Sequence, residues 1–137
     1  MAYKYLEARG DTGRKNLNRE LLSHRTPEKS TAVVQQSMLA LHNDTGAAQS
    51  IPFEWRWFID FPNPGDPSLV TPDVPEHRVQ FTVDLADQER RRLTGRRLYM
   101  TDGMRLEPES TIQLSLGAGN LPAVEFELGI ILERQKR

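Results

Sequence analysis

The sequence predicts a mainly β protein: an antiparallel β-sandwich with one short helix and an extended N-terminal arm. Three observations predict it. At least six short segments alternate apolar and polar residues, turn signals separate them, and only one segment has a helical pattern. Each strong segment has one apolar and one polar face, which is typical of antiparallel sheets and not of buried parallel ones. Alternation does not say which strands pair, so jelly-roll and immunoglobulin-like orders stay open.

The length of 137 residues fits one domain, which we divide into three parts. Residues 1–30 are expected to form an extended or weakly ordered arm, residues 31–133 the sandwich, and residues 134–137 a basic tail. The arm holds seven basic and four acidic residues, a local charge of +3, and has few apolar ones. Such an arm can become ordered against a neighbour, or it can be an ordinary frayed terminus. One short helical candidate lies at 16–23.

The predicted strands share a face of β-branched, aromatic or long aliphatic residues at every second position. They are 31–42, 51–60, 78–85, 96–101, 111–116 and 123–133. The segment 78–85 (RVQFTVDL) is the clearest, since four apolar and four polar residues alternate without a break. The second half of 31–42 is also compatible with a helix.

Two segments depart from this pattern. Five prolines fall between positions 62 and 75, and because proline lacks a backbone donor, residues 61–77 are expected to form a long surface loop. Residues 84–93 (DLADQERRRL) are expected to form the short helix. Acidic residues lie in its first turn, arginines in its last, and Gly95 stands where a C-terminal cap belongs.

Composition excludes several kinds of chemistry. With no cysteine, the chain has no disulfide, thiolate metal site or cysteine nucleophile. The three histidines lack metal-ligand spacing, and no motif of hydrolases or nucleotide-binding enzymes is present. The carboxylate pairs Glu107/Glu109 and Glu125/Glu127 are interpreted as solvated. We therefore expect no enzyme activity, no cofactor and no metal.

Charge and hydropathy bear on location and partners. The net charge of −1 lacks the basic excess typical of nucleic-acid-binding proteins, so nucleic-acid contact is expected only through the arm or an arginine cluster. No apolar run is long enough for a membrane span, and the N-terminus does not resemble a secretory signal. These patterns predict a product made in the cytoplasm.

Several residues are candidates for partner contact. Trp55 and Trp57 share a face with core residues, so burial is expected rather than a sugar- or base-stacking platform. Phe58 lies on the opposite face among charges and can anchor a partner or pack under the proline loop. The densest group of arginines is Arg90–Arg92 with Arg96 and Arg97. This arginine cluster can contact an acidic neighbour, or it can be the solvated end of the predicted helix, balanced by nearby carboxylates. The predicted contact residues are Arg14, Lys15, Arg19, Phe58, Arg90, Arg91 and Arg92.

The C-terminal half has a distinctive cadence: a strand at 97–101, a turn Leu106-Glu-Pro-Glu-Ser110, an amphipathic strand, a Gly/Asn turn at 117–120 and a long last strand at 124–132. This order of strands and turns resembles that of small β-sandwich and jelly-roll structural proteins of bacterial viruses. The resemblance implies a jelly-roll-like sandwich. It further implies a virion structural role in the capsid, on the head surface or in the tail, with copies of itself and other virion proteins as partners. It supplies no functional residues.

The predicted function is therefore that of a virion structural or assembly subunit, made in the host cytoplasm and located in the virion. The alternative is a carbohydrate- or protein-binding module that uses loop 61–77 and the strand carrying Trp55, Trp57 and Phe58. An enzyme using Glu125, Glu127 or the histidines comes third.

Overall fold

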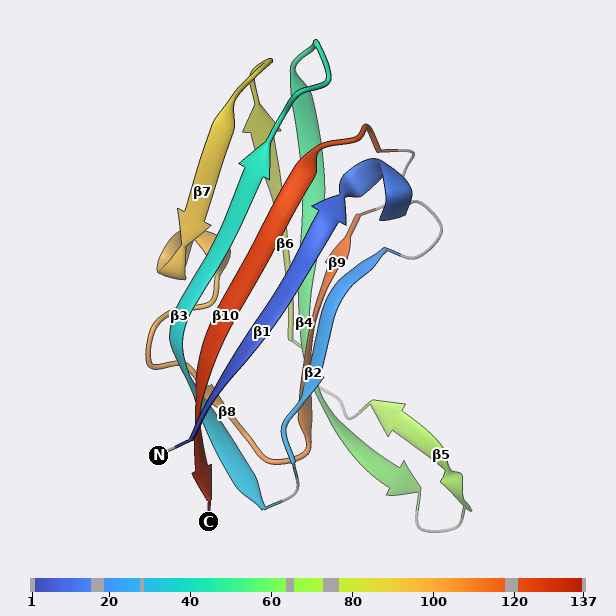
Figure 1. Cartoon of the computed structure of the whole chain (residues 1–137). Coiled ribbons are helices and arrows are strands. Elements are labelled where there is room, and N and C mark those ends of the chain that lie inside the picture. The colour runs from blue at the N-terminus through green and yellow to red at the C-terminus, as the bar shows by residue number, and fades with distance from the viewer. Residues whose placement is uncertain are drawn as a thin grey trace.

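The computed structural model describes the backbone of residues 2–15, 19–27, 29–63, 66–72, 77–117 and 121–136. Side chains are described for residues 3–13, 19–27, 29–57, 78–117 and 121–135. The described chain forms two antiparallel sheets that pack face to face (Figure 1).

Sheet 1 has the strand order β1-β10-β3-β7, and β8 also pairs with β3. Its strands are β1 (Ala2–Asp11), β10 (Glu125–Lys136), β3 (Ser30–His42), β7 (Arg90–Thr94) and β8 (Arg105–Leu106). Sheet 2 has the order β2-β9-β4, after which β6 and β5 both pair with β4. Its strands are β2 (Glu20–Arg25), β9 (Ser110–Leu116), β4 (Gln49–Asn63), β6 (His77–Leu85) and β5 (Asp66–Pro72). Two short 3₁₀ helices, η1 (Thr12–Lys15) and η2 (Gly95–Leu98), connect strands.

This strand order is that of a jelly roll. The chain crosses from one sheet to the other at each step from β1 to β4, and again between β6 and β7, between β8 and β9 and between β9 and β10. The sheets β1-β10-β3-β7 and β2-β9-β4-β6 that result form two interlocked Greek keys. The first and last strands are neighbours, so the two chain ends lie close together (Figure 1). The predicted antiparallel sandwich is confirmed, and the open question of strand order is resolved as jelly-roll.

The core lies between the sheets, where the alternate residues of each strand point inward. Ile51, Phe53 and Trp55 of β4 face the inner side of sheet 1, to which β10 contributes Leu128 and Ile130. The Trp55 indole N–H, fully buried, donates a hydrogen bond of 2.8 Å to the Leu98 carbonyl. Alternation therefore predicted the inward face of these strands correctly, including the burial of Trp55.

The expected N-terminal arm differs from what the structure contains. Residues 2–11 form β1, which pairs with β10 along its whole length, and residues 20–25 form β2, which pairs with β9. Three leucines of this segment point inward and are buried: Leu6, Leu21 and Leu22. Pairing with a neighbouring strand orders each of these segments, although their composition alone did not indicate a strand. Of the helical candidate at 16–23, residues 20–23 belong to β2, and residues 16–18 lie outside the described residues.

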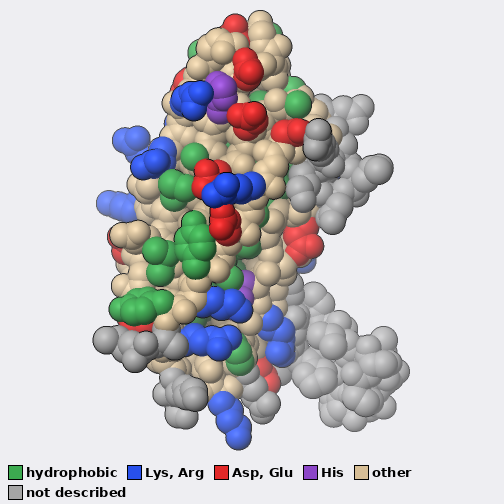
Figure 2. Space-filling model, in the orientation of Figure 1, with side chains coloured by type: hydrophobic (Ala, Val, Ile, Leu, Met, Phe, Trp, Pro, Cys, Tyr) green, Lys and Arg blue, Asp and Glu red, His purple; other side chains and the backbone are tan. Residues whose placement is uncertain are grey.

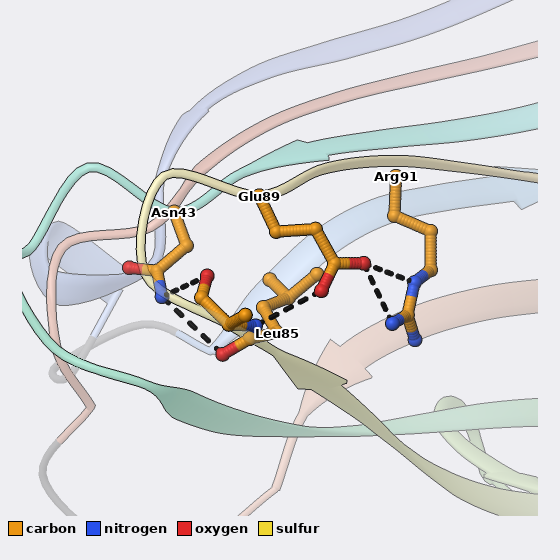
Figure 3. A network of polar contacts seen from close by, with 5 residues as sticks. Asn43, Leu85, Glu89 and Arg91 are labelled. Carbon is orange, nitrogen blue, oxygen red and sulfur yellow. Dashed lines mark hydrogen bonds and ion pairs between the residues drawn. The ribbon is translucent and has the colours of Figure 1, made fainter.

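The short helix expected at 84–93 is not present. The chain leaves β6 at Leu85, turns at 86–89 and returns as β7. The acidic and basic residues that suggested a helix dipole instead hold this turn. The Glu89 carboxylate accepts a hydrogen bond of 2.9 Å from the Ala86 backbone N–H and binds the Arg91 guanidinium at 2.6 and 2.8 Å (Figure 3). These contacts lower the pKa of the Glu89 carboxyl group, and the hydrogen bond from Ala86 has the largest effect.

Two further segments were assigned the wrong local structure. The segment expected as a strand at 96–101 is η2 followed by a turn, in which Tyr99 takes a left-handed conformation with φ of 60°. The proline segment was expected as a loop, but β4 continues to Asn63 and pairs with β5, and this hairpin projects from the sandwich (Figure 1). Prolines are tolerated there because the hairpin lies outside the central ladders of sheet 2.

Candidate protein-interaction surface

The outer face of sheet 2 is polar and internally satisfied. Its side chains alternate with the buried residues of β4, β6 and β9. Gln80 donates a hydrogen bond of 3.2 Å to Glu54, and Gln113 donates one of 3.2 Å to Glu20. Arg56 donates to Gln113 at 3.5 Å, which joins β4 to β9. A face covered by such a ladder of polar side chains is suited to solvent.

The outer face of sheet 1 is different, because apolar side chains gather on it. Tyr3 and Tyr5 of β1 are 62% and 56% exposed. Ile131 of β10 lies opposite Tyr5, and Val33 and Met38 of β3 follow on the far side of β10. We call these five residues the tyrosine patch. Figure 2 looks onto this face and shows hydrophobic side chains beside a cluster of acidic and basic ones.

Gly129 of β10 shapes the centre of the tyrosine patch. A β-carbon at this position would lie 2.8 Å from the Tyr5 hydroxyl oxygen. The Tyr5 ring therefore packs against β10 at Gly129, which has no side chain. This contact holds the ring on the sheet while leaving more than half of the residue exposed.

A charged band crosses the same face beside the patch. Arg9 forms ion pairs with Glu7 at 2.7 Å and with Glu127 at 3.1 Å, and His42 contacts Glu125 at 3.2 Å. Residues from β1, β3, β7 and β10, including Arg90 and Arg92, line an open depression there. Exposed pairs of this kind contribute little to stability, so the band offers charge that a partner can still use.

The structure brings some of the predicted contact residues together and separates others. Arg90, Arg91 and Arg92 line the depression, but Arg91 is bound to Glu89. Arg19 lies just before β2 of sheet 2, and its guanidinium donates to the Gly117 carbonyl. Arg14 and Lys15 lie in η1 and Phe58 lies in β4, and the side chains of all three are outside the described residues. Whether these seven residues contact a partner stays a prediction.

Sequence reasoning missed the tyrosines. They were assigned to a polar arm, although Tyr3, Tyr5, Glu7 and Arg9 occupy alternate positions, which is itself a strand signal. That signal could have placed both tyrosines on one face. It could not have placed them beside Ile131 and Met38, because local alternation does not show that β1 pairs with β10 and that β10 pairs with β3.

The features considered for catalysis or ligand binding have structural roles where they are described. Glu125 and Glu127 point outward from sheet 1 toward His42 and Arg9. Trp55 is inside the core, and the Trp57 ring packs 5.8 Å from it, so Trp55 offers no stacking platform. Within the described ranges, no three His, Asp or Glu side chains lie close enough to hold a metal ion together.

His24 is the buried histidine of β2. Burial lowers its pKa, and the positive charges of Lys4 and Arg134 lower it further. These two residues come from β1 and β10, so the histidine lies where the edges of the two sheets meet.

Both helical segments in the described chain are 3₁₀ turns of four residues, and neither has the length or hydropathy of a membrane-spanning helix.

No family model matches the sequence, and no curated protein matches it. Among solved structures, the chain is similar to a structure of infectious bursal disease virus, Gx strain. The identity is 9%, the match covers 98% of this chain and 36% of that one, and the TM-score is 0.42. It is also similar to a semi-empty virus-like particle of the giant freshwater prawn Macrobrachium rosenbergii nodavirus, at 8% identity, 99% and 85% coverage and a TM-score of 0.27.

A third similar structure is the T13 viral particle of infectious bursal disease virus, at 10% identity, 98% and 39% coverage and a TM-score of 0.23. This chain thus spans well under half of the infectious bursal disease virus chains. All three structures come from viruses, and none is described as a bacterial virus. The fold assignment rests on the strand order.

Proposed function

We propose that this protein is a structural subunit of a virus particle that acts through protein–protein contacts, with the outer face of sheet 1 as its main contact surface. The observation that carries the proposal is the contrast between the two outer faces. Sheet 2 covers its outer face with a polar ladder, whereas sheet 1 leaves Tyr3 and Tyr5 more than half exposed. Exposed aromatic groups ringed by charge are typical of protein interfaces.

The fold by itself does not decide the function, since jelly rolls serve as capsid, lectin and enzyme domains. The surface is more informative. Tyrosine supplies large contact area at low cost in side-chain entropy, and Tyr5 is already held against β10 at Gly129. A partner that covers the patch therefore gains apolar burial without first ordering this ring.

The finer parts of the proposal rest on the sequence resemblance. They are a bacterial virus as the source, a capsid, head-surface or tail position, synthesis in the host cytoplasm, and copies of itself plus other virion proteins as partners. The charged band beside the patch supports a protein partner, because its acidic and basic groups can each meet an opposite charge.

The proposal is tested by light scattering after size-exclusion chromatography on the full chain and on a Tyr3→Ser/Tyr5→Ser variant. We expect the wild type to form a defined oligomer and the variant to be smaller at the same concentration. Tyr99→Ser is the matched control, because Tyr99 is 47% exposed but lies in the turn after η2, away from the patch. A double variant that assembles like the wild type would remove the patch from the proposal.

A further inference from the structure

We infer that the free edge of β1 pairs antiparallel with β1 of a second copy, so that two copies of sheet 1 join into one continuous sheet. The inference deepens the proposed function, on which it rests, by naming the partner and the register. It starts from the place of β1 in the fold. Among the described strands, β1 is the terminal strand of sheet 1 and pairs only with β10, in a register that runs from Ala2 to Asp11 without a shift.

A long regular edge is uncommon, because it offers a row of unpaired backbone groups to other chains. The other described edge strands are shorter than β1. β7 has five residues, three of them arginines, and β2 is interrupted by a register shift near Glu20. β6 is one residue shorter than β1, and the Tyr99 ring packs 5.2 Å from its Phe81 ring. β1 contains no proline and no bulge in its ten residues.

The orientation of the backbone shows which groups are free. Just past β1, the Thr12 N–H donates to the Val124 carbonyl at 2.9 Å, in line with the register of the strand. In an antiparallel ladder, alternate residues bond to a given neighbour. The even-numbered residues of β1 therefore bond to β10, and the odd-numbered ones direct their N–H and C=O groups to the free edge. These residues are Tyr3, Tyr5, Glu7 and Arg9, the same residues whose side chains lie on the outer face.

The sequence of β1 is complementary to itself in one register. With Leu6 opposite Leu6 of the second copy, Tyr3 lies opposite Arg9 and Tyr5 opposite Glu7. A cation–π contact and a hydroxyl–carboxylate hydrogen bond can form, each occurring twice by symmetry. The four odd-numbered pairs give about eight backbone hydrogen bonds between the copies. On the inner side, Lys4 lies opposite Ala8, whose small side chain leaves it room.

Other registers are poorer. A shift of one residue would turn the outer face of one copy to the inner side of the other, so only shifts that keep both faces need to be considered. The next such register in one direction places Glu7 opposite Glu7, which is repulsive. The next in the other direction places Tyr5 opposite Tyr5 and shortens the paired segment at its charged end. The two-fold axis at Leu6 is therefore the arrangement we assign.

The first test substitutes Tyr5→Pro in the full chain. Proline at this position removes a backbone donor that faces the free edge, while the hydrogen bonds of β1 to β10 come from its neighbours. Sedimentation equilibrium should then show a dimer dissociation constant that rises by about tenfold or more. Tyr5→Ala is the control, since it removes the ring and keeps the donor, and its effect should be smaller. Far-ultraviolet circular dichroism checks that each variant is folded.

The second test does not depend on proline being tolerated. The chain has no cysteine, so a Tyr5→Cys/Glu7→Cys variant carries the only thiols, and these lie opposite each other across the assigned dimer. The expected Cα separation in such a pair is about 5.5 Å, which suits a disulfide. We expect rapid covalent dimerisation on oxidation. The single Tyr5→Cys variant should crosslink slowly, because in this register residue 5 does not face its own copy.

The outcomes separate this inference from the proposed function. A wild type that assembles, together with a folded Tyr5→Pro variant that assembles equally well, would overturn β1 pairing and leave the proposed function standing. Fast crosslinking of the single Tyr5→Cys variant and not of the double one would overturn the register. A wild type that stays monomeric at all concentrations would overturn both.

Discussion

Asn43 shows how single residues fix the corners of this sandwich. It is fully buried just after β3, and its side-chain amide donates to the Ala47 carbonyl at 2.8 Å. The same amide donates to the carbonyls of Ala86 at 3.0 Å and Leu85 at 3.4 Å (Figure 3). Its side-chain oxygen accepts from the Thr45 backbone N–H at 3.2 Å. One side chain thus ties the β3–β4 turn to the turn between β6 and β7, and so couples the two sheets.

We expect Asn43→Asp to lower the free energy of unfolding by about 2–3 kcal/mol, because the carboxylate keeps the acceptor but leaves the surrounding carbonyls without a donor. Urea unfolding followed by tryptophan fluorescence measures this difference. Asp44→Asn, at the exposed neighbouring position, is the control and should change stability little. Equal stability of the two variants would show that the amide donors do not hold the corner.

His24 gives the fold a dependence on pH. Because burial and the charges of Lys4 and Arg134 lower its pKa below the unfolded value of 6.5, the unfolded state binds the proton more readily than the folded one. As pH falls through 6.5 toward the lowered folded pKa, stability should fall, and below that pKa this contribution should stay constant. We expect the His24→Gln variant to lose this part of the pH dependence in thermal melts between pH 7.5 and 5. His42→Gln is the control, and a pH dependence that persists in His24→Gln would contradict the assignment.

At the scale of elements, close contacts between strands set the limits on substitution. Gly117 follows β9 and lies beside Pro52 of β4, and its N–H donates to the Pro52 carbonyl at 2.9 Å. A β-carbon at 117 would lie 2.7 Å and 2.8 Å from carbons of the Pro52 ring, which cannot rotate away. We expect Gly117→Ala to lower the melting temperature, at a cost of about 1–3 kcal/mol. Ser115→Ala, on the same outer face, should have a small effect, and an unchanged melting temperature for Gly117→Ala would mean that the strand end moves freely.

The elements also show why some strands were predictable and others were not. β4, β6, β9 and β10 were predicted because every second residue in each is a large apolar one. β1 has Leu6 as its one buried large residue, so its composition resembles that of a mobile arm. The turn and strand at 86–94 have charges in the order of a helix dipole, and only the contact of Glu89 with Ala86 and Arg91 shows that they hold a tight turn. Local sequence cannot distinguish these two uses of the same charges.

At the scale of the whole molecule, the jelly roll brings together segments that are far apart in the sequence. The sequence predicted strands with inner and outer faces that form an antiparallel sandwich. It did not predict the tyrosine patch, because Tyr5, Met38 and Ile131 become neighbours only through the order β1-β10-β3. That order depends on long-range pairing, which alternation leaves undetermined. The surface that carries the proposed function is therefore a product of topology.

Sedimentation velocity of the wild-type protein over a hundredfold range of concentration tests most directly whether this chain assembles. We expect a species with an integral multiple of the 15.7 kDa chain mass, which dissociates to the monomer on dilution. A single sharp boundary at the monomer mass across the whole range would contradict it.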